Sequence, residues 1–169
     1  NENHDFKTVV IDSLDWLESL IWKQVCIDNK VPSIEKIGYG RGYNEALVFW
    51  SYFFDELNKC RDKGMLVIMT AHSQVNKVDD PEYLTFDTHD IKLHKKAAAL
   101  CREFADVIGY ASLKKIIKVT DDRNRAISTG ERLLNLSTSP AYTAKNRYDM
   151  PSTMPLLWSE FAKHLPSQK

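Results

Sequence analysis

The sequence lacks several features that would assign it to a protein class at once. Its 169 residues carry 23 basic and 23 acidic side chains, so no net charge indicates a nucleic-acid or membrane partner. Any such contact must therefore come from a local patch. The three cysteines, Cys26, Cys60 and Cys101, are scattered and odd in number, which predicts neither a disulfide framework nor a zinc site. We expect ordinary core thiols in a reducing compartment.

Long apolar runs and targeting segments are missing as well. No apolar stretch approaches the roughly 18 residues of a membrane span. The first residues, NENHDF, have no signal-peptide character. We therefore expect a soluble, cytoplasmic protein. The length favours a single domain over 1–169, with enough chain to bury a core.

The stretch at 7–15, KTVVIDSLD, is the most informative part of the chain. Residues 9–11 form an apolar run that predicts a strand buried on both faces, and Asp12 follows at its carboxyl end. Open α/β sheets bind their ligands at that edge. A carboxylate followed by the Ser13 hydroxyl suits a nucleotide-bound Mg²⁺, the pattern called Walker B. An aspartate that merely caps the next helix is the alternative.

Helical spacing and apolar runs predict the other elements. We expect helices near 14–25, 44–61 and 91–104, a short helix after Pro155, and buried strands at 65–70 and 106–111. Residues 75–90 have no clean period and contain Pro81, which predicts a long loop. Residues 116–127 and 132–138 predict strands around a polar turn, more antiparallel than parallel.

The stretch IGYGRGYNEA places two aromatic side chains and a cation between glycines. It does not match GxxxxGK[ST], so we do not interpret it as a phosphate-binding loop. Tyr39, Arg41 and Tyr43 could stack on bases and contact a backbone phosphate. A mobile surface turn is an equal alternative.

Two further segments carry candidate side chains. His72 follows the strand at 65–70, where it could contact a phosphate, although an ordinary strand-end polar residue is the commoner case. Lys145 and Arg147 lie in a loop ended by Pro151, where they could reach a neighbour's phosphates or simply be solvated. A metal site is disfavoured at four acidic and histidine residues in and after the long loop, Asp87, His89, Asp90 and His94.

Taken in order, these signals resemble a known family. The succession TVVIDSLD, YGRGY, GMLVIMTAHSQ, LHKKAAALCREFADVIGYA and AKNRYDMP is similar to the RecA-like P-loop ATPases of phages, the ATP-binding recombination proteins associated with single-strand annealing. The resemblance covers nearly the whole chain. It implies an α/β fold with a mainly parallel central sheet flanked by helices, and an antiparallel strand pair toward the C-terminus.

The resemblance also implies functional roles at individual residues. Asp12 would bind Mg²⁺, with Ser13 beside it at the nucleotide, and His72 would sense the γ-phosphate of ATP. Lys145 and Arg147 would form a KxR element that acts on the ATP of the adjacent subunit in a homo-oligomer. Asp12, His72, Lys145 and Arg147 would thus be the catalytic set.

Single-stranded DNA is the implied partner. Family DNA-binding loops would correspond to the glycine loop at 38–43, with Tyr39, Arg41 and Tyr43, and to the loop at 75–90, with Lys77. The resemblance further implies a single-strand-binding protein as partner and a phage or prophage origin in a bacterial host.

The chain departs from the family at one important point. The GxxxxGK[ST] loop should precede the Asp12 strand by many residues, and only six residues precede that strand here. We expect the C-terminal part of a longer ATPase, inactive alone, rather than a degenerate paralogue. Asp149 also stands where helicase-type elements tend to have glycine. Two functions remain open: an ATP-hydrolysing recombination protein on single-stranded DNA, and a non-catalytic RecA-like interaction or DNA-binding module.

Overall fold

The computed structural model describes residues 5–81, 84–120 and 123–165 of the chain, which adopts a mixed α/β structure. These residues form two compact units, which are described separately. The first contains 5–74 and 91–104. The second contains the described residues of 75–90 and 105–165.

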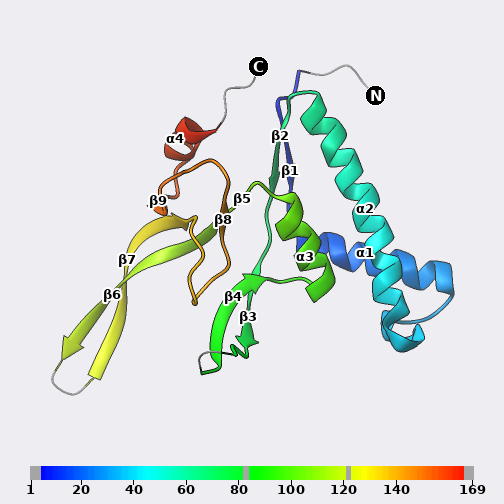
Figure 1. Cartoon of the computed structure of the whole chain (residues 1–169), viewed down its shortest axis with the longest axis horizontal. Coiled ribbons are helices and arrows are strands. Elements are labelled where there is room, and N and C mark those ends of the chain that lie inside the picture. Colours follow the sequence, from blue (N-terminus) through cyan, green and yellow to red (C-terminus); the bar gives the residue numbers. More distant parts are fainter. Residues whose placement is uncertain (1–4, 82–83, 121–122, 166–169) are drawn as a thin grey trace. The chain divides into compact units, whose positions relative to one another are not determined.

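Three helices and a parallel strand pair make up the first unit, together with two short 3₁₀ turns (Figure 1). In chain order these are β1 (Thr8–Ile11), α1 (Leu14–Asn29), η1 (Ile34–Lys36), η2 (Gly38–Gly40), α2 (Arg41–Asp62), β2 (Leu66–Met69) and α3 (Lys95–Phe104). β1 and β2 pair in parallel, from Thr8 with Leu66 to Ile11 with Met69. Strands are therefore confirmed at both positions, but their predicted burial on both faces is wrong: β2 is half-buried, and Val10 of β1 is 55% exposed, because the pair has no further strand beside it in the described sheet.

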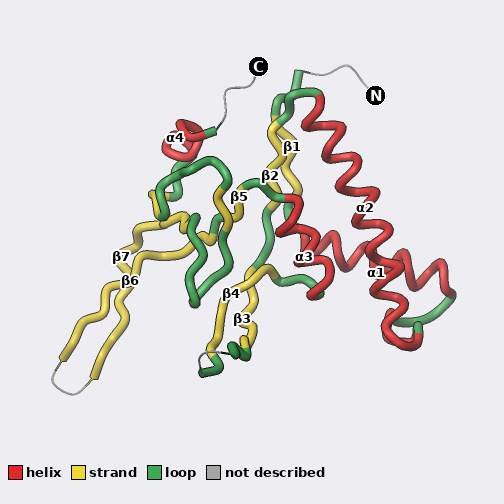
Figure 2. Tube along the Cα trace, in the orientation of Figure 1, coloured by secondary structure: helices red, strands yellow, loops and turns green. Residues whose placement is uncertain are grey.

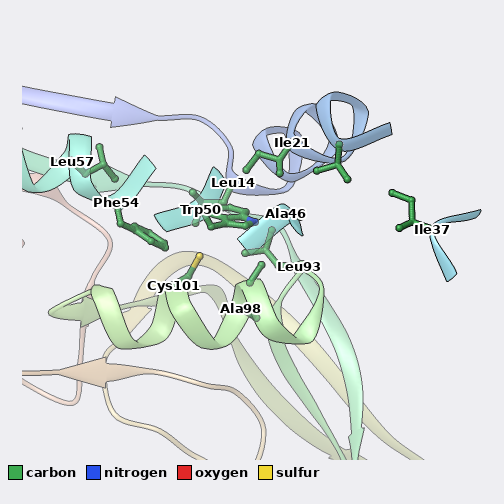
Figure 3. Packing of buried hydrophobic residues seen from close by; sticks show 12 residues of the cluster. Leu14, Ile21, Ile37, Ala46, Trp50, Phe54, Leu57, Leu93, Ala98 and Cys101 are labelled. Atoms are coloured by element: carbon green, nitrogen blue, oxygen red, sulfur yellow. The ribbon is translucent and has the colours of Figure 1, made fainter. Parts of the chain in front are cut away.

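The core of the first unit lies between its helices, as Figure 3 shows. Trp50 of α2 is 0% exposed, and three further α2 residues at helical spacing are buried with it: Ala46, Phe54 and Leu57. They pack against α1 through Leu14 and Ile21 and against α3 through Ala98 and Cys101. The helices predicted at 14–25 and 44–61 are thus confirmed, and α1 continues to Asn29.

Two strands occupy much of the segment in which the sequence predicts a long loop. β3 (Ser73–Val78) and β4 (Phe86–Ile91) form a two-stranded sheet, so the loop prediction for 75–90 is wrong. Exposed and half-buried residues alternate along β3, and its side chains have little apolar character. Pairing with β4 supplies hydrogen-bond partners for the backbone of β3. Because β4 continues to Ile91, the predicted helix at 91–104 begins only at Lys95.

The remaining strands of the second unit, yellow in Figure 2, form antiparallel pairs. They are β5 (Val107–Ile108), β6 (Tyr110–Thr120), β7 (Arg123–Asn135), β8 (Lys145–Asn146) and β9 (Thr153–Pro155), followed by the helical turns α4 (Trp158–Phe161) and η3 (Ala162–His164). β6 and β7 form a long antiparallel pair that β9 extends. The predicted antiparallel direction is confirmed, but the predicted bounds are wrong, because the described residues of 116–127 belong to two strands rather than one. A second small core gathers around Leu136, Met150 and Met154.

The third buried strand predicted at 106–111 is found only in part, as half-buried pieces of two strands. β5 is two residues long and pairs antiparallel with β8, and β6 begins at Tyr110. An apolar run marks burial but does not select the partner that sets strand direction. The parallel sheet found among the described residues has two strands, β1 and β2, so a mainly parallel central sheet is not shown.

Two further features concern the cysteines and the lengths of the helices. All three cysteines are free, and burial raises the pKa of the Cys101 thiol to about 12. Cys26 and Cys60 are half-buried, so of the three expected core thiols Cys101 alone is fully buried. Of the helices in the described ranges, none combines the length and apolar character that a membrane crossing requires.

Candidate functional site

Asp12 and Thr70 meet at the carboxyl edge of the parallel strand pair. Because Ile11 and Met69 are in register, the next residue of each strand leaves the sheet at the same point. The Thr70 hydroxyl donates to Asp12 Oδ1 at 2.6 Å, and the Thr70 N–H donates to the Ile11 carbonyl at 2.9 Å. Asp12 and Thr70 are both exposed, so this edge presents a carboxylate to a ligand.

These residues fit one side of a Mg²⁺ site. Mg²⁺ usually takes one or two protein carboxylates and completes its octahedron with waters and substrate phosphates. Asp12 offers such a carboxylate, whereas the buried Ser13 hydroxyl donates its proton to Asp15 Oδ1 at 2.7 Å and keeps only lone pairs for a ligand. No group of three His, Cys, Asp or Glu within 5–81, 84–120 and 123–165 could hold a metal alone. A nucleotide would have to complete the coordination.

Asp15 gathers three hydrogen bonds beside this edge. Its Oδ1 accepts from the Ser13 hydroxyl and, at 3.2 Å, from the backbone N–H of His72. Its Oδ2 lies 2.9 Å from His72 Nδ1. His72, which the sequence identifies as a candidate, is therefore brought to the same edge as Asp12, with its side chain 67% exposed.

The charge of Asp15 follows from these contacts. Burial by itself would raise the pKa of the carboxyl, but the hydrogen bonds from Ser13 and from the His72 backbone and ring outweigh it and hold the pKa at about 2. Asp15 is thus ionised at neutral pH. Sequence reasoning missed this residue, because its position in the first turn of a helix is ordinary for an acidic side chain.

Glu18 lies one helical turn further along α1. It is buried in the apolar face of that helix, and both its oxygens accept the backbone N–H of His94, directly before α3. Burial is the main reason that its pKa is raised, and the negative charge of Asp15 adds to the effect. The missed signal was an acidic residue at a core position of an otherwise apolar stripe, which usually means a buried acceptor with a specific partner.

The glycine loop is a tight turn that leads into α2. Tyr39 has a positive φ of 58°, and its side chain is fully exposed between Gly38 and Gly40. Gly40 also has a positive φ, of 68°. A Cβ on Gly42 would lie 2.7 Å from a side-chain atom of Ile34, so close packing requires glycine there. The glycines thus serve turn geometry and packing, while Tyr39 points into solvent.

Arg41 and Tyr43 differ in their availability. Arg41 begins α2 and is exposed. The Tyr43 ring stacks on the His94 ring, with ring centroids 4.3 Å apart and an angle of 2° between the ring planes. The Tyr43 hydroxyl donates a hydrogen bond to Glu35 at 3.2 Å. Trp22 packs edge-on against Tyr43, with ring centroids 5.4 Å apart. The DNA-binding role of Tyr39, Arg41 and Tyr43 stays a prediction, and the contacts favour the first two.

Lys77 lies on β3 in the second unit and is exposed. It stands on a strand of a two-stranded sheet rather than on the predicted loop. A side chain on an exposed strand face is available to a backbone phosphate, so its DNA-binding role also stays a prediction.

Lys145 and Arg147 lie at and after β8, in the second unit. Lys145 pairs with Ile108 across the β5–β8 ladder. Arg147 donates from Nη1 to Asp106 Oδ1 at 2.9 Å and from its backbone N–H to the Asp106 carbonyl at 3.2 Å. The Arg147 side chain is 55% exposed. Asp106, missed in the sequence, therefore orients this guanidinium within its own chain, and both cations keep their predicted roles as predictions.

Comparison with known proteins gives one result that bears on this geometry. A family model described as AAA domain matches residues 1–148. Neither the search of curated proteins nor that of solved structures gave a significant match. The matched range includes the strand that ends at Asp12, the strand that leads to His72, and the loop with Lys145 and Arg147. The chain therefore belongs to the AAA domain family, a family of ATPase-like, nucleotide-binding P-loop proteins.

Proposed function

We propose that this chain forms the metal-facing and terminal-phosphate-facing side of an ATP hydrolysis site. The observation that carries the proposal is the convergence of Asp12, Thr70 and His72 at the carboxyl edge of a parallel strand pair. A carboxylate is a usual protein ligand of Mg²⁺, and an exposed imidazole can contact a phosphate group by hydrogen bonding. Membership of a nucleotide-binding family supports the same chemistry.

The roles follow from what each side chain can do. Asp12 would hold the metal, Ser13 would lie beside it with its hydroxyl turned to Asp15, and His72 would contact the terminal phosphate. When bound, Mg²⁺ neutralises charge on the phosphates. The sequence contains no GxxxxGK[ST], so the cradle of backbone amides around the phosphates would come from outside these residues.

Lys145 and Arg147 would act on the nucleotide of a neighbouring subunit. An exposed guanidinium can stabilise charge that develops on the transferring phosphate. In the isolated chain Arg147 is paired with Asp106, so this role requires it to exchange a carboxylate for a phosphate. Both are oxygen anions with which the planar guanidinium pairs well.

We further propose that the protein is a RecA-like recombination ATPase of phage type that acts on single-stranded DNA as a homo-oligomer. The succession of motifs supports this assignment, including the order of strand, glycine turn and basic loop. Tyr39 and Arg41 supply an exposed ring and a cation at the start of α2, and Lys77 supplies a second cation. Stacking together with phosphate contacts is how proteins hold single strands without reading their sequence.

The test is Mg²⁺-dependent ATP hydrolysis by the full natural protein, with and without single-stranded DNA. We expect hydrolysis that requires Mg²⁺ and increases with DNA, and weak or undetectable MgATP binding by residues 1–169 alone in calorimetric titration. The absence of GxxxxGK[ST] favours one alternative, a non-catalytic interaction or DNA-binding module. DNA binding by the full protein without nucleotide binding would establish that alternative.

A further inference from the structure

Asp15 holds both the backbone and the ring of His72, although the two residues are 57 positions apart. One carboxylate oxygen accepts the backbone N–H at 3.2 Å, and the other lies 2.9 Å from Nδ1. The His72 carbonyl is held as well, because it accepts the N–H of Lys92 at 2.8 Å. The backbone of His72 is thus fixed on both sides, and the ring is fixed by Asp15.

This arrangement determines which ring nitrogen carries a proton. An ionised carboxylate can only accept hydrogen bonds, and the pKa of Asp15, about 2, keeps it ionised at neutral pH. Nδ1 must therefore be the donor in its contact with Asp15. The other nitrogen, Nε2, makes no hydrogen bond to another side chain or backbone group of the described residues, and the ring is largely exposed.

We propose that Asp15 is the positioning residue for His72: it fixes the orientation of the ring and keeps the proton on Nδ1, so that Nε2 is the atom presented to the terminal phosphate. This inference rests on the proposed function. In the neutral ring Nε2 is an acceptor and would face a water molecule beside the phosphate. In the protonated ring it is a donor and can contact a phosphate oxygen directly.

A positioning residue is needed here because His72 is otherwise unconstrained. A ring with 67% exposure would rotate in solvent, and ordering it at the moment of reaction would cost free energy. The buried Ser13 hydroxyl completes the arrangement, since it occupies Asp15 Oδ1 and leaves Oδ2 to the ring. The Asp15 side chain is only 12% exposed, so little water competes for these contacts.

The test is the tautomer of His72, measured by ¹⁵N NMR of the imidazole at a pH where the ring is neutral. We expect the proton on Nδ1 in residues 1–169. In Asp15→Asn, Oδ1 must remain the oxygen because Ser13 and the His72 N–H both donate to it, so the new NH₂ faces Nδ1. The proton should then move to Nε2. His72→Gln identifies the signal, and Asp28→Asn, an exposed change on the same helix, should leave the tautomer unchanged.

A proton on Nε2 in the wild-type chain overturns the inference, and so does an unchanged tautomer in folded Asp15→Asn.

In the full protein, Asp15→Asn should lower kcat for ATP roughly 10- to 100-fold, as loss of a supporting hydrogen bond does at other sites. The KM for ATP should change less than about twofold, because only orientation for the chemical step is lost. The tautomer is measured without nucleotide, so it is independent of ATP hydrolysis. If the proton is on Nδ1 but the full protein hydrolyses no ATP, the positioning role is supported and the proposed function is contradicted. If the full protein hydrolyses ATP but the proton is on Nε2, the positioning role alone is contradicted.

Discussion

Both carboxylate oxygens of Glu18 accept the backbone N–H of His94, at 3.1 and 3.0 Å, at the point where α3 begins. The contact joins α1 to the N-terminus of α3, where a negative charge is favourable. The His94 ring stacks at the same time on Tyr43 of α2. One residue pair therefore links the three helices of the first unit.

Glu18→Ala should lower the free energy of unfolding by about 1–3 kcal/mol, because it leaves the partly buried N–H of His94 without its acceptor. The matched control is Glu56→Ala, which removes an exposed carboxylate paired with Lys59 and should cost no more than about 0.5 kcal/mol. Urea denaturation measures both. Equal losses in the two variants would show that the Glu18 contact contributes nothing particular.

Asp15 should make stability depend on pH in the acid range. Its folded-state pKa is lowered from 3.8 to about 2, so its contribution is present above the unfolded value and lost as pH falls through the folded value. We expect about 1–2 kcal/mol, less than the shift alone would give, because the His72 side chain that contacts Asp15 is 67% exposed and solvent screens the interaction. Glu18, whose pKa is raised, works in the opposite direction. The difference in unfolding free energy between wild type and Asp15→Asn, measured from pH 6 to the lowest pH at which the protein stays folded, isolates the effect. A difference that does not vary with pH would contradict it.

Asp12→Asn should cut the ATP turnover of the full protein by orders of magnitude and leave its fold intact. The amide cannot supply the anionic oxygen that the metal needs, whereas the Thr70 hydroxyl can still donate to the amide oxygen. Turnover and a thermal unfolding curve are the two measurements. Asp28→Asn is the control for loss of a carboxylate in the same unit. Near-normal turnover in Asp12→Asn would mean that the metal is held elsewhere.

Arg147→Ala should be inactive alone and regain activity when mixed with Asp12→Asn. In a random mixed oligomer about a quarter of the heterologous interfaces pair an intact Asp12 with an intact Arg147 from the neighbour. Arg132→Ala, which removes an exposed arginine of β7, should remain active by itself. The assay is ATP hydrolysis by oligomers shown to be mixed. If none regains activity, Arg147 does not act across a subunit interface.

Tyr39→Gly should weaken binding to single-stranded DNA without lowering stability. Loss of one stacked base costs about 1–3 kcal/mol, roughly 5- to 150-fold in affinity. Glycine suits the positive φ of 58° better than tyrosine, so the unfolding midpoint should not fall. Fluorescence anisotropy with a labelled oligonucleotide measures the affinity. Tyr52→Ala, which removes an exposed ring from the middle of α2, is the control; an equal loss in both variants would remove Tyr39 from the interface.

The sequence by itself determined the elements whose pattern is local. The apolar spacing of α2 at Ala46, Trp50, Phe54 and Leu57 predicts its buried face, because a period of 3.6 places those side chains on one side. The run before Asp12 likewise predicts a strand with a carboxylate at its end. The candidate status of Asp12 and His72 follows from strand ends alone, since parallel strands share a ligand-binding edge.

Only the tertiary structure decided which residues meet. The register of β1 with β2 brings His72 to Asp15 and Thr70 to Asp12, and no local pattern specifies a pairing between positions more than fifty residues apart. The strands in 75–90 escaped prediction for the same reason, because half-exposed polar strands are stabilised by their partner rather than by their own propensity. Local preference is set by neighbouring side chains, whereas pairing and direction depend on contacts that exist only after the chain has folded back on itself.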